Sequence, residues 1–384
     1  MKLPSTNYAI VAASLLLSCT LFSFLPDAQE LKYTQAPTIA SDHDPEQSIV
    51  LAFRDTLSED SLFLVKTQDH IPLHYFKPIT TEVCFDQECR LLSIIVFWNI
   101  TGRYLGFELP AGEFLSKRDH EPFFNDEYER LNDLLADPTL PLGEVSFHNL
   151  LERPNTPADS IDGVTGATTP ALSQVVVQGA AYTTYTLWNI IYGPTQDLVM
   201  HLTEKQLSPA LMTLILQSPD LSDKAWALNR LSKKTTLSPQ LSTALVGIIS
   251  GEDFFLSYAA INAIKPVHLS IDTLQFALFS IYQEASHSIK SLLIEKLMEA
   301  PALHAEVTAS FRKVLRQLNG KQLGDVLKLY TKHAINDLDT LKTVAEILKN
   351  KNNYISGQAY RFLQKAKVSD PGIVELLHQY AQNR

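Results

Sequence analysis

A signal for the start of a helix occurs twice in this chain, thirty residues apart. Leu207-Ser208-Pro209 is repeated as Leu237-Ser238-Pro239, and an apolar segment follows each copy. A serine just before a helix accepts hydrogen bonds from free backbone N–H groups, and proline is tolerated in the first turn. Further helix starts are predicted near Leu221, Glu252, Ser270-Ile271-Asp272, His287, Leu303, Lys321, Leu338, Asn353 and Pro371. We therefore expect residues 200–384 to be all-helical.

These helix starts are spaced as pairs. One pair takes roughly 30–34 residues and recurs about five or six times, which is typical of stacked helical repeats. The pattern resembles an α-solenoid of the HEAT-like type. Such arrays present long concave surfaces, so the resemblance implies a docking role for residues 200–384.

The region from Ile49 to about Pro110 has the texture of β-structure. Short apolar runs lie between turn residues, and a turn is predicted over Asn99–Gly102. A short helix is expected over Asp126–Leu135, with Tyr128, Leu131, Leu134 and Leu135 along one face. Residues 49–195 are therefore predicted to form one α+β domain, and residues 29–48 to be a flexible lead-in. The expected strands are Ser61–Val65, Pro72–Phe76, Leu91–Trp98 and Arg103–Leu109.

A short hydroxyl-rich motif stands between these two regions. Residues 162–168 read Asp-Gly-Val-Thr-Gly-Ala-Thr, which has the form D-x-x-[S/T]-G-A-T. Pro170 and the apolar residues after it predict one helix that runs up to Gly193-Pro194. A small turn at a helix start is suited to holding a phosphate, because backbone N–H groups and the helix dipole favour an anion there. Gly166 lets the backbone approach closely, and Ala167 adds no bulk.

At this motif the chain resembles the FMN-binding domain family, in which FMN is joined to the last threonine through a phosphoester. The resemblance implies that Thr168 carries FMN and that Asp162, Thr165, Gly166 and Ala167 complete the binding motif. It also implies that a flavin transferase takes FAD and moves its FMN half onto the threonine. Asp162 is equally compatible with a solvent-facing turn residue. The family's E-T-P-G-like segment is absent here, and Phe107–Gly112 occupies a similar place.

Three side chains are candidates for contact with a flavin ring. Tyr185 and Trp188 share one face of the predicted helix with Tyr192, at i, i+3 and i+7. Packing in the core is the commoner role of such a stripe. His120 lies in the loop after the strands, where a histidine has many structural roles and, more rarely, supplies a proton.

The N-terminal segment predicts export. Lys2 precedes a nearly unbroken apolar run from Tyr8 to Leu25, and Ala28 offers a cleavage position, so residues 1–28 read as a signal peptide. The run is also long enough for a membrane anchor. Leu16–Cys19 loosely resembles a bacterial lipobox, which would make Cys19 a lipid attachment site. All three interpretations place the protein in the periplasm or at the cell surface.

Cys84 and Cys89 flank a four-residue turn. In an oxidising compartment this spacing favours a disulfide across a hairpin, with two free thiols or a metal ligand pair as alternatives. No second pair of Cys or His residues lies at ligand spacing, so no metal site is expected.

The overall charge excludes one class of function. With a formal net charge of −10 and no basic run, the chain lacks the surface that nucleic acid needs. The chain contains neither a G-x-S-x-G nor an H-E-x-x-H motif, so the sequence does not predict a hydrolase. No catalytic residue is predicted, and we expect an electron carrier that relays electrons to a redox protein partner. The alternative is a cofactor-free secreted scaffold that binds a protein through its helical repeats.

Overall fold

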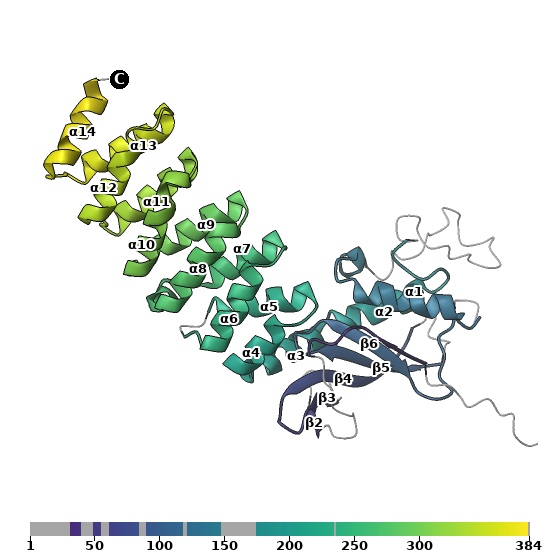
Figure 1. Cartoon of the computed structure of the whole chain (residues 1–384). Helices are drawn as coiled ribbons and strands as arrows, with labels where there is room; N and C mark the ends of the chain where they lie inside the picture. Colours follow the sequence, from purple (N-terminus) through teal and green to yellow (C-terminus); the bar gives the residue numbers. More distant parts are fainter. Residues whose placement is uncertain are drawn as a thin grey trace, which may run out of the picture. The chain divides into compact units, whose positions relative to one another are not determined.

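The computed structural model describes residues 31–39, 49–54, 61–83, 90–117, 121–146, 174–233 and 236–382. These residues divide into two compact units. The sheet unit comprises residues 31–35 and the described residues from 49 to Met200. The helical unit comprises residues 36–39 and the described residues from His201 onward. An α+β part therefore precedes an all-α part, as the sequence predicts (Figure 1).

The sheet unit is built on one antiparallel sheet. Its strand order is β1-β6-β5-β4-β3-β2, and the four predicted strands are β3 to β6. Strands β4 and β5 pair as far as Thr81 and Leu92, which confirms the predicted hairpin. The strands are β1 (Leu31–Thr34), β2 (Ile49–Arg54), β3 (Ser61–Lys66), β4 (Pro72–Thr81), β5 (Leu92–Asn99) and β6 (Tyr104–Leu109).

The predicted flexible lead-in over residues 29–48 is wrong for its first part. Leu31–Thr34 forms the edge strand β1 and pairs with β6, from Leu31 opposite Leu109 to Thr34 opposite Gly106. Four residues are too few to show an alternating apolar pattern, so this segment forms a strand only because it pairs with a strand that is distant in sequence. The backbone of β6 supplies that partner.

One face of the sheet is covered by helices α1 (Asn125–Ala136) and α2 (Ala181–Ile191) (Figure 1). The predicted apolar stripe of α1 is buried. Two side chains of the sheet bind the helices directly. The Trp98 indole N–H donates to the Ile191 carbonyl over 3.0 Å, and the Tyr104 hydroxyl donates to Asn132 Oδ1 over 3.0 Å. These contacts fix the two-layer core of the sheet unit.

The prediction of one unbroken helix from Pro170 to Gly193 is wrong. Residues 174–180 form turns, and α2 begins only at Ala181. Gly179 has a φ of +77°, a left-handed conformation that an α-helix does not contain. The predicted break at Gly193-Pro194 is confirmed, because helix α3 (Pro194–Lys205) starts there.

The helical unit begins its helices where the sequence predicts them, within about two residues. Ser208 Oγ accepts a hydrogen bond from the Leu211 N–H over 3.1 Å, and Ser238 Oγ accepts one from Leu241 over 3.2 Å. Both serines are therefore N-caps. The helices are α4 (Pro209–Leu216), α5 (Leu221–Leu231), α6 (Pro239–Ile249), α7 (Phe254–Ala263), α8 (Asp272–Glu284), α9 (His287–Met298), α10 (Ala305–Val314), α11 (Gly320–Lys332), α12 (Leu338–Ile347), α13 (Asn353–Lys365) and α14 (Pro371–Gln382).

Successive helical pairs stack in two layers. Helices α4, α6, α8 and α10 contact one another in turn, as do α5, α7, α9, α11 and α13. Most helices also pack against their pair partner, for example α6 against α7 and α8 against α9. Successive pairs therefore lie against one another along the helical unit (Figure 1).

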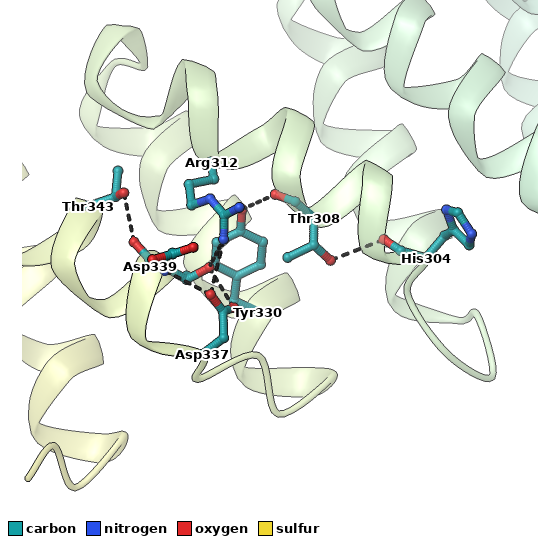
Figure 2. A network of polar contacts seen from close by, with 8 residues as sticks. His304, Thr308, Arg312, Tyr330, Asp337, Asp339 and Thr343 are labelled. Atoms are coloured by element: carbon teal, nitrogen blue, oxygen red, sulfur yellow. Dashed lines mark hydrogen bonds and ion pairs between the residues drawn. The ribbon is translucent and has the colours of Figure 1, made fainter.

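Polar contacts join α10, α11 and α12 within this stack (Figure 2). Arg312 Nη1 donates to Asp337 Oδ1 over 3.0 Å, and the Tyr330 hydroxyl donates to the Thr308 carbonyl over 2.9 Å. Partial burial works against the charge of Asp337, but hydrogen bonds from Thr340 and the charge of Arg312 hold its pKa below the usual value. Because these groups serve as hydrogen-bond and charge partners for one another, we interpret the network as one that holds the three helices together.

No helix in the described ranges combines the length and the apolarity that a membrane span requires. The apolar run from Tyr8 to Leu25 lies outside those ranges.

Candidate functional site

The motif and several other predicted site residues lie outside the described residues. Asp162, Thr165, Gly166, Ala167 and Thr168 fall in the gap between residue 146 and residue 174. The other predicted residues in such gaps are His120, Cys19, Cys84 and Cys89. The FMN attachment and the disulfide therefore stay predictions, and the described residues define what lies on either side of them.

The segment that follows the motif is attached firmly to the sheet unit. A guanidinium N–H of Arg130, on α1, donates to the Gln174 carbonyl. Val176 and Val177 are buried, and the Val177 N–H donates to Thr184 Oγ1 over 3.1 Å. The chain that leaves the motif thus meets a fixed point at Gln174, next to a cation.

The N-terminus of α2 has no side-chain cap. Its N-cap residue is Ala180, and its first turn contains no acidic residue. Ala180, Ala181 and Thr183 are buried. The N–H groups at a helix start carry partial positive charge, and burial strengthens their attraction for an anion. This is the kind of helix start that the sequence placed directly after Thr168, but it lies further along the chain.

Lys117, which directly precedes the gap at residues 118–120, lies next to the segment after the motif. The Lys117 N–H donates to the Glu121 carbonyl over 2.7 Å, so the described residues on the two sides of the gap at 118–120 are bonded to each other. A Cβ added to Gly179 would lie 3.4 Å from the Lys117 side chain. A hydrogen bond to Glu127, over 3.0 Å, raises the pKa of Lys117 and keeps the amine protonated. The structure therefore places Lys117, before the gap that contains His120, beside Gly179, which follows the gap that contains the motif.

Trp188 is a core residue of the sheet unit, and the half-buried Tyr192 packs against it. Trp188 is 7% exposed, and its indole N–H donates to the Asp137 carbonyl over 2.9 Å. The ring of Tyr192 packs against Trp188 with a centroid distance of 4.6 Å, and its hydroxyl donates to the Leu135 carbonyl. Burial raises the pKa of Tyr192. Tyr185 is half-buried on the same helix. The predicted stripe thus holds α2 against α1, and flavin contact by Tyr185 or Trp188 stays a prediction.

The sheet face opposite α1 and α2 carries a row of aromatic rings. Phe63, Phe76 and Phe97 are cross-strand neighbours on β3, β4 and β5, with centroid distances of 4.9 and 5.9 Å. The Lys32 amine lies 5.1 Å from the Phe97 ring centroid. Burial, assisted by the charge of Lys32, lowers the pKa of His74 to about 4, so this imidazole is neutral at pH 7. Sequence reasoning had found the strands but not this row.

Arg130 and Lys117 were also missed by sequence reasoning. Each lies in a segment without a motif, and its relation to Gln174 or Gly179 exists only in the folded chain. Among the described residues, no group of three His, Cys, Asp or Glu side chains is placed to hold a metal ion.

Comparisons of the chain with models of protein families, with curated proteins and with solved structures find no match.

Proposed function

We propose that this chain is an exported electron-transfer flavoprotein that carries FMN as a phosphoester on Thr168. The observation that carries the proposal is the D-x-x-[S/T]-G-A-T motif of residues 162–168. Its setting supports the proposal, because the unit that contains the motif is an antiparallel sheet with a helical layer. No catalytic residue is assigned, since an electron carrier needs a bound redox group and access to its partners.

The anchored segment after the motif would hold the cofactor in a defined region. Six residues of chain lead from Thr168 to Gln174, and an extended chain of that length reaches about 20 Å. Electron transfer requires a redox group whose position relative to its partners is limited. The Arg130 contact and the two buried valines supply that limit on the C-terminal side of the motif.

The described flank also suits a phosphate. Arg130 uses one donor on Gln174, and a guanidinium group has further N–H donors for phosphate oxygens. The uncapped N-terminus of α2 would favour the same negative charge. We assign these two features as the groups that would hold the phosphate. Asp162 and Thr165 would support the turn around Thr168.

The loading reaction would be a transfer of FMN from FAD by a flavin transferase. The Thr168 hydroxyl oxygen forms a new P–O bond, the phosphoanhydride bond of FAD breaks, AMP leaves, and the hydroxyl proton passes to solvent. When bound, FMN supplies a ring that accepts and releases electrons one or two at a time. The polypeptide contributes position and electrostatics.

The helical unit would dock this carrier to a redox protein, either membrane-bound or soluble. We propose that it is a HEAT-like solenoid, because its helical pairs stack in two layers and each pair contacts the pair that follows it. The apolar run before residue 28 would export the protein to the periplasm or cell surface, as a cleaved signal, an anchor or a lipoprotein with Cys19 modified.

The test is to express the exported chain together with a flavin transferase and to weigh the intact protein. We expect a mass gain of one FMN less one water, and the flavin absorption that accompanies it. Thr168→Ala should abolish the gain. Thr169→Ala removes the neighbouring hydroxyl and is the matched control, so it should leave the gain unchanged. A protein that stays colourless, or a flavin that persists in Thr168→Ala, would reject the assignment.

The alternative is a scaffold without a cofactor, whose working part is the helical unit. Exposed aromatic residues on that unit favour this second candidate. A colourless protein that still binds a partner through residues 200–384 would establish it.

A further inference from the structure

The surface of the helical unit is hollowed beside helix α6. The hollow has a volume of about 840 Å³ and lies between the end of α6, the start of α7, the end of α8 and the start of α9. We call it the α6 groove. Most of its wall is apolar, and its apolar lining residues include Val246, Ile249, Phe254, Ala277, Ile281 and Ile289.

Two neighbouring hollows extend the α6 groove along the stack. One of about 690 Å³ lies between α4, α5 and α6, and it shares Gly251 and Glu252 with the α6 groove. Another of about 290 Å³ lies between the starts of α6 and α8, and it shares Val246 and Ala277. A single small molecule fits within one hollow of such size. A surface that continues around α6 suits a longer occupant, such as a polypeptide segment.

Exposed aromatic rings form the lip of the α6 groove. Phe254, Phe255 and Tyr258 are 45%, 80% and 47% exposed, and they lie together in the first turns of α7. Phe254 contacts both other rings, with centroid distances of 5.8 Å to Phe255 and 6.4 Å to Tyr258. An exposed group of large apolar side chains beside a hollow is typical of a protein-binding surface.

The charge of the groove selects the partner. Glu252 and Glu284 line it, and its lining residues include no lysine or arginine. Both carboxylates are exposed, and neither forms an ion pair with another described residue. The neighbouring hollow, which shares Glu252, is also lined by Lys224 of α5 and by Asp253. An occupant with basic side chains would therefore find two unpaired acids at the edge of an apolar wall.

We propose that the α6 groove binds an amphipathic segment of a partner protein. One side of this segment is apolar and packs against the wall between α6 and α8 and against the aromatic lip. Its other side carries lysine or arginine, which pair with Glu252 and Glu284. This is recognition of a helix in a groove, with electrostatic selection at the rim. The inference stands on the helical unit alone and does not require a flavin on Thr168.

The probe is a labelled synthetic peptide in which leucine recurs every three or four residues and lysine fills the other positions. Fluorescence anisotropy with the full chain measures its affinity. We expect saturable binding of this peptide, and none of a version with glutamate in place of lysine. The double substitution Glu252→Lys and Glu284→Lys should weaken binding roughly tenfold or more. The matched double substitution Glu295→Lys and Glu306→Lys alters exposed acids outside the groove, and it should leave binding nearly unchanged.

A second pair of variants tests the apolar wall. Ala277→Phe fills the groove where two hollows meet and should also weaken binding, whereas Ala210→Phe changes an exposed alanine of α4 and should not. Circular dichroism confirms that each variant is folded. Equal losses in both charge variants, or full binding by Ala277→Phe, would overturn the proposal. If the chain self-associates and Ala277→Phe abolishes this, the groove binds a second copy of the chain. If the chain binds phosphatidylcholine vesicles and Ala277→Phe abolishes this, the groove binds lipid. Either result would also overturn the proposal.

Discussion

The sheet unit and the helical unit differ in the distance over which their structure is specified. In the helical unit, most described helix starts follow from a few adjacent residues, such as Ser208 and Ser238 as caps and the prolines behind them. In the sheet unit, β1 pairs with β6 although most of the sheet lies between them in sequence. The structure of the helical unit is therefore determined mostly by residues close in sequence, whereas the sheet unit depends on contacts that only the complete fold supplies.

The same difference appears in the polar contacts of the two units. In the sheet unit, Trp98 and Tyr104 bind groups on α2 and α1 that lie far along the chain. In the helical unit, Tyr330 of α11 binds the Thr308 carbonyl on α10, the other helix of its own pair, and Gln275 binds the Ala302 carbonyl and the His304 N–H at the start of the next pair. A defect in the helical unit should thus stay near its origin, and a defect in the sheet unit should spread.

The largest effect is expected at Gly106, where β1 and β6 approach. An added Cβ would lie 2.0 Å from the Tyr33 carbonyl oxygen, and φ is +154°. We predict that Gly106→Ala destabilises the sheet unit by about 4 kcal/mol, because backbone strain and the clash add. In a Trp226→Phe background, Trp98 and Trp188 report this unfolding by fluorescence, while circular dichroism reports the helices.

Gly112→Ala is the matched control for this change. Gly112 also has a positive φ, of +82°, but nothing lies within 4 Å of the added Cβ. It should cost about 1 kcal/mol, from backbone strain alone. Equal losses in the two variants would show that the approach of β1 to β6 does not limit stability, and the proposed contrast between the units would fail.

This contrast explains how much of the fold the sequence could predict. Strands β3 to β6, helix α1 and the helix starts after residue 200 carry periodic apolar patterns and turn residues. Strand β1 is short and lacks such a pattern, so a reading of local residues misses it. The interruption before α2 was missed for another reason. Val175 and Val176 match the helical period, but Gly179 takes a left-handed conformation and α2 starts after it.

The next effect is a dependence of sheet-unit stability on pH. The pKa of His74 is about 4 in the folded protein and about 6.5 in an unfolded chain. Between these values the unfolded state binds more protons, so stability is present above pH 6.5 and is lost as the pH falls toward 4. We expect a loss of about 3 kcal/mol at most, measured as urea unfolding of the sheet unit at several pH values in this window.

His74→Gln should remove most of this dependence on pH, because the substituted side chain does not titrate. His378→Gln is the control, since it replaces an exposed histidine in the helical unit. If the unfolding curves of His74→Gln keep the wild-type slope against pH between about 6.5 and 4, another group carries the effect.

The smallest effect is expected at a helix cap. Ser238→Ala removes the acceptor for the Leu241 N–H and should cost about 1 kcal/mol. Hydrogen exchange should show the loss in α6 and its immediate neighbours, while α12 and α13 keep their protection. Ser238→Asp retains an acceptor and should restore stability, and Ser288→Ala, at an exposed serine inside α9, should have little effect. A loss spread evenly over all the helices would contradict the local character of this unit.

The residues of the candidate site also differ in whether the local sequence reveals them. The motif of residues 162–168 can be found from sequence because its spacing is fixed within seven residues. Arg130 and Lys117 cannot, because nothing near them in sequence marks their contacts with Gln174 and Gly179. The α6 groove escapes local reading too, because its walls come from four helices.

The pairing of β1 with β6 also sets an order of events during biosynthesis. Leu31–Thr34 emerges among the first residues of the fold, but its partner strand is made only after β2, β3, β4 and β5. Until then the backbone N–H and C=O groups of β1 have no strand to bind. Keeping this stretch extended and solvated during synthesis would speed correct assembly, whereas early folding of the other strands would leave the edge of β6 unpaired until β1 binds it.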